Sequence, residues 1–256
     1  MRYAQYEIVG LDNFFLKIYN VTNQSYGGEN KKMPKQTFFN LPEKKRNKII
    51  NISLLEFAQH SYRAASLSRI VEKAGIAKGS MYQYFKNKKG LYLYLINFTT
   101  NRKLSYIDRH LDSSIENFYM LYKQIIFLAV KYDLENLGKS LFTYNALNNR
   151  SDKEMREIAM KMKEKKRIFL KKYVITARER GQIRKDVDVD LITCIINQIS
   201  MNFGTYMGIK FNFNYINLIE KGILKLPISD EKLELTVDEL IEIFKHGFEP
   251  KNKTKA

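Results

Sequence analysis

The chain has 256 residues and a formal net charge of +17, from 44 Lys and Arg against 27 Asp and Glu. Its one cysteine, Cys194, excludes an intramolecular disulfide and suits a reducing cytoplasm, and its apolar surroundings predict a core position. No run of about 20 uncharged apolar residues occurs, so we expect a cytoplasmic protein without a membrane span. The three histidines lie far apart in sequence, without the spacing of metal ligands, so we expect no metal or cofactor.

The first 40 residues differ from the rest of the chain. Residues 23–30, Asn-Gln-Ser-Tyr-Gly-Gly-Glu-Asn, are typical of a loop. We therefore expect residues 1–40 to be a leader or flexible arm, with two alternatives open: sequence upstream of the natural start, or a mobile arm. Few positive charges lie in 1–32, which disfavours an arm that enters a DNA minor groove.

From Leu41 onward nearly every segment has the apolar period of a helix. Pro42 fits the first turn of the first helix, because proline tolerates a helix start. The buried stripe of that helix is predicted to be Ile49, Ile50, Leu54, Phe57 and Ala58.

Residues 66–85 have the pattern of two short helices around a glycine. Ser66 stands where an N-cap belongs, and Gly75 stands where the first helix must stop, since the residue past a helix end often takes a left-handed conformation. The second helix, from Lys78 to Phe85, is too short to be stable alone, so its neighbours must hold it. This is the pattern of a helix-turn-helix whose second helix reads a DNA major groove.

These residues resemble the N-terminal domain of the TetR family of bacterial transcriptional regulators, over about residues 42–105. The matching features are Tyr62, Ile70, Ala74-Gly75-Ile76, the run Gly79 to Phe85, and Lys88 with Leu91. The chain departs from the family pattern at Ser53, Ser61, Ala65, Val71 and Ala77. Ala77 replaces a helix-capping serine, a loss of about 1 kcal/mol, but no departure removes an expected DNA contact.

The resemblance implies DNA-binding roles for eight residues. The positions that read or approach base edges correspond to Lys78, Gly79, Ser80 and Gln83, and glycine at 79 allows close backbone approach. Tyr82 and Lys88 match phosphate contacts, and Ser66 can offer its hydroxyl and nearby helix amides to another phosphate. Three alternatives stay open for Tyr84: a phosphate contact, a thymine methyl contact, or packing.

The remaining residues predict a helical body. Asn87 and Lys88 open a long helix that connects head and body, Ser113 or Ser114 caps a helix through about Asp133, and a short helix covers Leu137 to Asn148. Two capping boxes, Ser151–Glu154 and Thr236–Glu239, are predicted to start a long helix that stops at Gly181 and a last helix that ends near Gly247. Asp188 or Asp190 begins an apolar helix to about Met207.

The body has no glycine-rich phosphate loop, nucleophile elbow or metal-ligand cluster, so we expect no enzymatic activity. Its many aromatic residues are typical of an ordinary core, but the resemblance implies that some line a cavity for a small-molecule effector. We predict a small, largely apolar effector near Tyr122, Phe142, Tyr173 and Asn202. The polar residues Asn197, Gln198 and Asn202 either orient this ligand or bond across a dimer seam.

One head reads only a few base pairs, so specific binding requires a homodimer with two heads in successive major grooves, on a palindromic double-stranded operator. The helix 191–207 and the last helix, with Leu240, Ile241, Ile243 and Phe244, are the candidates for the seam, and in the resembling family such helices form a four-helix bundle between subunits. Packing within one subunit is the alternative.

The sequence therefore predicts an all-α protein, with an N-terminal three-helix helix-turn-helix head over residues 41–90 and a larger ligand-binding and dimerisation body over 91–256. Residues 41–91 hold 11 Lys and Arg against 3 Asp and Glu, a net +8, and such concentrated charge favours phosphate binding. We expect a sequence-specific DNA-binding regulator, a repressor released by an effector as the resemblance implies. The alternative is a nonspecific nucleic-acid-binding or nucleoid-associated protein without an effector.

Overall fold

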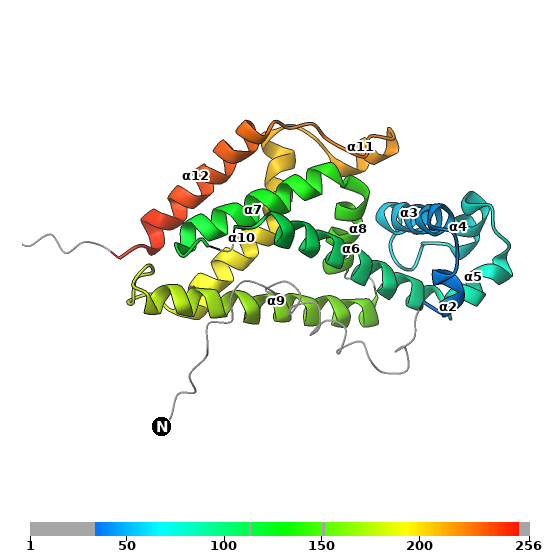
Figure 1. The fold of residues 1–256 in the computed structure, drawn as a ribbon, viewed down its shortest axis with the longest axis horizontal. Coiled ribbons are helices and arrows are strands. Elements are labelled where there is room, and N and C mark those ends of the chain that lie inside the picture. Colours follow the sequence, from blue (N-terminus) through cyan, green and yellow to red (C-terminus); the bar gives the residue numbers. More distant parts are fainter. Residues whose placement is uncertain (1–33, 113, 150–151, 251–256) are drawn as a thin grey trace, which may run out of the picture.

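The computed structural model describes residues 34–112, 114–149 and 152–250, which form helices and contain no strand (Figure 1). This confirms the all-α prediction. The head consists of α2 (Gln36–Phe39), α3 (Glu43–Gln59), α4 (Leu67–Ala74) and α5 (Lys78–Tyr84). The body consists of α6 (Lys88–His110), α7 (Phe118–Glu135), α8 (Leu137–Leu147), α9 (Lys153–Glu179), α10 (Val189–Lys210), α11 (Tyr215–Glu220) and α12 (Asp230–Phe248).

The local signals around the helix-turn-helix are confirmed. The Ser66 hydroxyl oxygen accepts a hydrogen bond from the Arg69 N–H at 3.4 Å, and Gly75 ends α4 with a φ of 68°, a left-handed conformation that glycine adopts without strain. Ala77 precedes α5 without a side-chain cap, as its methyl group requires. The Asn87 side chain accepts from the Gly90 N–H at 2.8 Å and so starts α6.

Residues 34–40, which we predicted to belong to the leader or flexible arm, are instead part of the folded head. Phe38 on α2 is fully buried and packs against Phe85 and Tyr94, with ring centroids 4.9 Å and 5.6 Å away. The reason is the hydrophobic effect, because this aromatic side chain finds an apolar site between α5 and α6. The rest of the predicted leader lies outside the described residues.

Head and body share one core. Phe57 of α3, Tyr92 of α6 and Phe142 of α8 are buried together, with the Phe142 ring 6.2 Å from Phe57 and 5.4 Å from Tyr92. The Asn145 side chain of α8 also donates to the Ala58 carbonyl at 2.8 Å. In Figure 1 the head lies at one end of the long axis, and α6 runs from it into the body. Both α6 and α8 therefore connect the head to the body.

A second core cluster lies within the body, where α9 packs along α10 and α12 packs against α7. Two predicted helix starts are wrong here. Asn117, and not Ser114, caps α7, because Ser114 is held in a turn by two hydrogen bonds to Asp112; the other candidate, Ser113, lies outside the described residues. Ser229 caps α12, whereas Thr236 lies inside that helix and donates to the Lys232 carbonyl. The predicted start of α9 agrees with the structure to within one residue: Asp152 is its cap, and Ser151 of the predicted box lies outside the described residues.

Helix α10 begins after Asp188, one of the two predicted caps, and extends beyond Met207 to Lys210. Cys194 is exposed on this helix, so its predicted core position is wrong: the helix turns Ile192 and Ile196 inward and leaves Cys194 outside. Helix α11 was not predicted, although Asn214 caps it. None of the described helices is both long enough and apolar enough to cross a lipid bilayer.

Candidate nucleic-acid interface

Helix α5 has one buried and one exposed face. Met81 and Tyr84 are buried, with 1% and 6% of their surfaces exposed, and they pack α5 against the other helices of the head. On the opposite face Lys78, Gly79 and Gln83 are exposed, and Tyr82 keeps 45% of its surface accessible. Ser80 lies between the two faces and is half-buried. The structure thus places three of the four predicted base-reading residues, together with Tyr82, on one accessible face, and Ser80 at its edge.

Neither the backbone conformation nor the packing of the described residues requires glycine at position 79. Its φ is not positive, and a Cβ built on its backbone meets no other atom within 4 Å. Glycine weakens a helix by about 0.5–1 kcal/mol relative to alanine. An exposed glycine within a helix, with free space where a side chain would lie, is typical of a surface that another molecule approaches closely.

Tyr84 behaves differently from its neighbours. Its ring is buried 5.8 Å from that of Phe38, on the side of α5 that faces the head core. Of the three alternatives left open by the sequence, packing is the one that the structure contains. Tyr84 therefore supports the interface from behind, and we do not count it among the DNA-contacting candidates.

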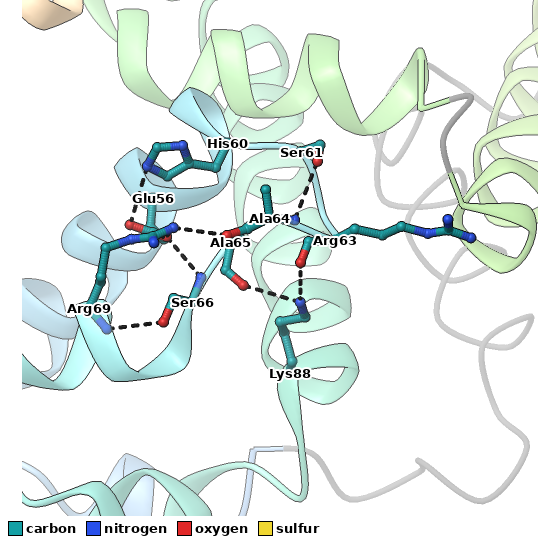
Figure 2. A network of polar contacts seen from close by, with 9 residues as sticks. All are labelled: Glu56, His60, Ser61, Arg63, Ala64, Ala65, Ser66, Arg69 and Lys88. Carbon is teal, nitrogen blue, oxygen red and sulfur yellow. Dashed lines mark hydrogen bonds and ion pairs between the residues drawn. The ribbon is translucent and has the colours of Figure 1, made fainter.

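Glu56 is a charged residue in the buried stripe of α3, and its carboxylate organises the start of α4 (Figure 2). Its Oε1 accepts hydrogen bonds from the Ser66 N–H at 2.8 Å, from Arg69 Nε at 2.9 Å, and from Arg69 Nη2. Burial raises the pKa of Glu56, but the hydrogen bonds from Arg69 and Ser66 outweigh it, so the pKa is lowered overall. The carboxylate is therefore ionised when it fixes α4 against α3.

Ser66 keeps part of its binding capacity in this arrangement. Its hydroxyl oxygen accepts from Arg69 and its amide donates to Glu56, but its hydroxyl proton has no acceptor among the described contacts. A hydroxyl can donate one hydrogen bond while it accepts another. Ser66 can therefore contact a phosphate without releasing its cap.

Lys88 is half-buried, and it binds the loop between α3 and α4 (Figure 2). Its ammonium group donates to the carbonyls of Arg63 and Ala65, both at 3.1 Å, and lies 4.9 Å from the centroid of the Tyr62 ring. An ammonium group has three donors, so one remains beyond these two bonds. Lys88 thus has a structural role that its match to a phosphate contact did not indicate.

The four residues predicted to bind an effector do not form one site. Tyr122 is buried between α7, α10 and α12, where its hydroxyl contacts Ser200 at 2.5 Å. Phe142 belongs to the other core cluster, at the junction with the head. Tyr173 is half-buried beside the body core, and Asn202 is exposed, with its amide donating to the Gln198 carbonyl. Helical period predicted the burial of Tyr122 and Phe142, but not that they lie in separate clusters or that Asn202 is exposed.

Helix α10 also carries two buried polar residues whose side-chain oxygens lack a hydrogen-bond partner. Thr193 Oγ1 and Asn197 Oδ1 have no hydrogen-bond partner among the described residues, and they lie one helical turn apart. Buried oxygen atoms normally have a partner, and Glu56 Oε2 and the Tyr132 hydroxyl are two other described ones that lack one. A surface hollow of about 420 Å³ lies elsewhere, between α7 and residues 225–230, and none of the four predicted residues lines it.

The organising role of Glu56 was not predicted from the sequence. A signal for it was present, because a glutamate between Leu54 and Phe57 falls within the apolar stripe of the first helix. Acidic side chains are seldom buried unless they are paired. Such a position indicates a buried ion pair, although the partner, 13 residues along the chain, cannot be read from the pattern.

The family comparison agrees with this geometry. Residues 49–95 match the family model described as bacterial regulatory proteins, tetR family. Over 103 residues the chain is 26% identical to the HTH-type transcriptional regulator QacR of Staphylococcus aureus, a match that covers 34% of this chain and 55% of QacR. The chain thus spans about half the length of this curated relative.

Solved structures resemble the chain over a larger part of its length. A TetR family transcriptional regulator from Chloroflexus aurantiacus is 28% identical, with a TM-score of 0.73 over 86% of this chain and all of that one. FadR of Bacillus subtilis, solved in complex with stearoyl-CoA, is 18% identical, with a TM-score of 0.54 over 75% of this chain and 96% of that one. The second likeness concerns the fold alone.

Proposed function

The chain belongs to the TetR family of bacterial transcriptional regulators, and from this premise we propose that it is a repressor that binds a palindromic DNA operator as a homodimer and is released by a small molecule. The observation that carries the DNA-binding part is the exposed face of α5, where Lys78, Gly79, Tyr82 and Gln83 lie together. We assign no catalytic step to the chain.

In this proposal the two kinds of DNA contact divide between residues. Lys78, Ser80 and Gln83 read base edges in the major groove, with Gly79 admitting the DNA close to the α5 backbone. Tyr82, Ser66 and the remaining donor of Lys88 hold phosphates and fix the register of the helix. The accessible surface of each of these residues supports contact with DNA, and the division between bases and phosphates follows the family resemblance.

The proposed dimer uses α10 and α12. Both helices expose large apolar side chains that their own subunit leaves uncovered: Leu191 (53%), Tyr206 (40%), Ile209 (75%), Leu235 (59%) and Ile243 (67%). Removal of such apolar surface from water favours association. A homodimer through this face gives the two heads that a palindromic operator requires.

The effector is proposed to bind within the body and to act through two helices. We place its polar group at Thr193 and Asn197, whose buried oxygens lack partners, and not at the four-residue set predicted from sequence. Since α6 and α8 both pack on the head, a ligand that favours another body conformation changes the separation of the two heads. The FadR structure with stearoyl-CoA makes a long-chain acyl-CoA the first compound to test.

Selection of bound fragments from genomic and random DNA tests the proposal. We expect a palindromic sequence to be enriched and to bind about 10³-fold or more tightly than unrelated DNA. Stearoyl-CoA is then added to the complex, and release of the operator supports that effector class. If the protein binds the selected sequence no more tightly than unrelated DNA, the proposal of a repressor is wrong, and a nonspecific nucleic-acid-binding protein is favoured.

A further inference from the structure

The C-terminal end of α5 is held by the segment that precedes the first long helix. The last carbonyls of a helix have no partner within it, and here these are the carbonyls of Tyr82, Gln83 and Tyr84, since the Met81 carbonyl accepts from Phe85. Lys35 Nζ donates to Tyr82 at 3.2 Å, and the Lys35 amide donates to Tyr84 at 2.9 Å. The Thr37 hydroxyl donates to Gln83 at 2.6 Å. Two residues thus satisfy every carbonyl that α5 leaves open.

A buried aromatic residue anchors this segment. Phe38 follows Thr37 directly, has no exposed surface, and packs among Tyr84, Phe85 and Tyr94. Full burial of such a side chain contributes about 1.5–3 kcal/mol. Lys35 and Thr37 are therefore tied to the same core that holds the buried face of α5.

Helix α5 depends on such support more than an ordinary helix does. It has seven residues, and isolated helices shorter than about 12 residues are marginal in water. Its N-cap is Ala77, which offers no side-chain acceptor. The positive charge of Lys35 also lies at the C-terminal end of α5, where the helix dipole favours a cation.

We propose that residues 34–41 form a clamp on the recognition helix, and that Lys35 and Thr37 are positioning residues for DNA reading. The inference rests on the proposed function. Two of the clamped carbonyls belong to Tyr82 and Gln83, which in that proposal contact a phosphate and a base. Without the clamp the last turn of α5 opens, and the Gln83 side chain no longer approaches its base from a fixed direction.

Hydrogen–deuterium exchange of the free full-length protein tests the clamp itself. Thr37→Val removes the hydroxyl donor at an exposed position, and one hydrogen bond of this kind corresponds to about 2- to 10-fold in an equilibrium constant. We expect exchange in residues 78–85 to accelerate by that factor while α10 is unchanged. Thr37→Ser restores the slow rate, and Gln36→Ala, on the same turn, is the matched control. Unchanged exchange in Thr37→Val overturns the clamp.

Binding to the selected operator and to unrelated DNA tests the positioning role. Thr37→Val should lower the ratio of operator affinity to affinity for unrelated DNA by about 2- to 10-fold, because the base contact of Gln83 acts only on the operator, whereas phosphate contacts act on all sequences. Faster exchange with an unchanged affinity ratio overturns the positioning role and leaves a structural clamp. If the wild type prefers no sequence, the proposed function fails and the positioning role fails with it, whereas the exchange result still decides on the clamp.

Discussion

Replacement of Gly79 by alanine should change stability and DNA binding in opposite directions. The added methyl group meets no described residue outside its own helical turn within 4 Å, and the backbone at this position is helical. Alanine therefore stabilises α5 by up to about 1 kcal/mol. For a chain of this size that raises the melting temperature by about 2–4 °C.

The same methyl group occupies space that DNA needs in the proposed complex. An extra methyl group in a closely packed contact costs about 1–3 kcal/mol, which corresponds to about 5- to 150-fold in operator affinity. Thermal unfolding by circular dichroism measures the first effect, and fluorescence anisotropy with a labelled operator measures the second. A loss of affinity with a gain in stability cannot arise from misfolding.

The matched control is Gly247→Ala. Gly247 also lies within two residues of a helix end, and a Cβ there likewise meets no atom within 4 Å. It should give a similar gain in stability without loss of operator affinity, with the mass checked by light scattering because α12 belongs to the proposed dimer. Wild-type affinity in Gly79→Ala would refute the argument that glycine at this position admits the DNA backbone.

Four further substitutions test other parts of the structure. Glu56→Gln should destabilise the protein by about 1.5–3 kcal/mol at neutral pH; because the folded-state pKa of Glu56 is lowered, this deficit persists above the ordinary value of 4.5 and shrinks as the pH falls through the folded-state value, which pH-dependent unfolding measures against Glu72→Gln. Gln83→Ala should lose about 1–3 kcal/mol of discrimination at one base pair, and an equal loss on all sequences contradicts base reading. Lys88→Met should weaken all sequences alike and reduce the salt slope by about one, and an unchanged slope assigns Lys88 to the loop alone. Ile243→Glu, at a side chain 67% exposed, should give a monomer in light scattering with unchanged helicity, and an unchanged mass removes α12 from the seam.

The helix-turn-helix of the head could be predicted from the sequence because its signals are local. Ser66 caps α4 through an amide three residues away, and Gly75 ends α4 through its own backbone conformation. Such interactions involve residues close together in the chain, so they can be recognised from the sequence. The division of α5 into a buried and an exposed face follows in the same way from helical spacing.

The sequence did not determine where some helices of the body begin, because several polar residues there can act as N-caps. Thr236 and Ser229 both have the right side chain, and packing of α12 against α7 decides for Ser229. Likewise Asn117 caps α7 while Ser114 bonds to Asp112. Residue type gives the candidate N-caps of a helix. Which candidate becomes the cap depends on how much of the helix packs against the core.

The all-α class, the helix-turn-helix and the exposed face of α5 could be read from the order of residues, since periodicity and capping act within a few residues. The contacts between distant residues could not: that Phe38 joins the head core, that Lys35 and Thr37 bind the end of α5, and that Tyr122 and Phe142 lie in separate clusters became clear from the packing of the helices. Helical period fixes the direction of a side chain from its own axis. The partner it meets depends on how whole helices pack, which is settled by the burial of apolar surface over the entire molecule.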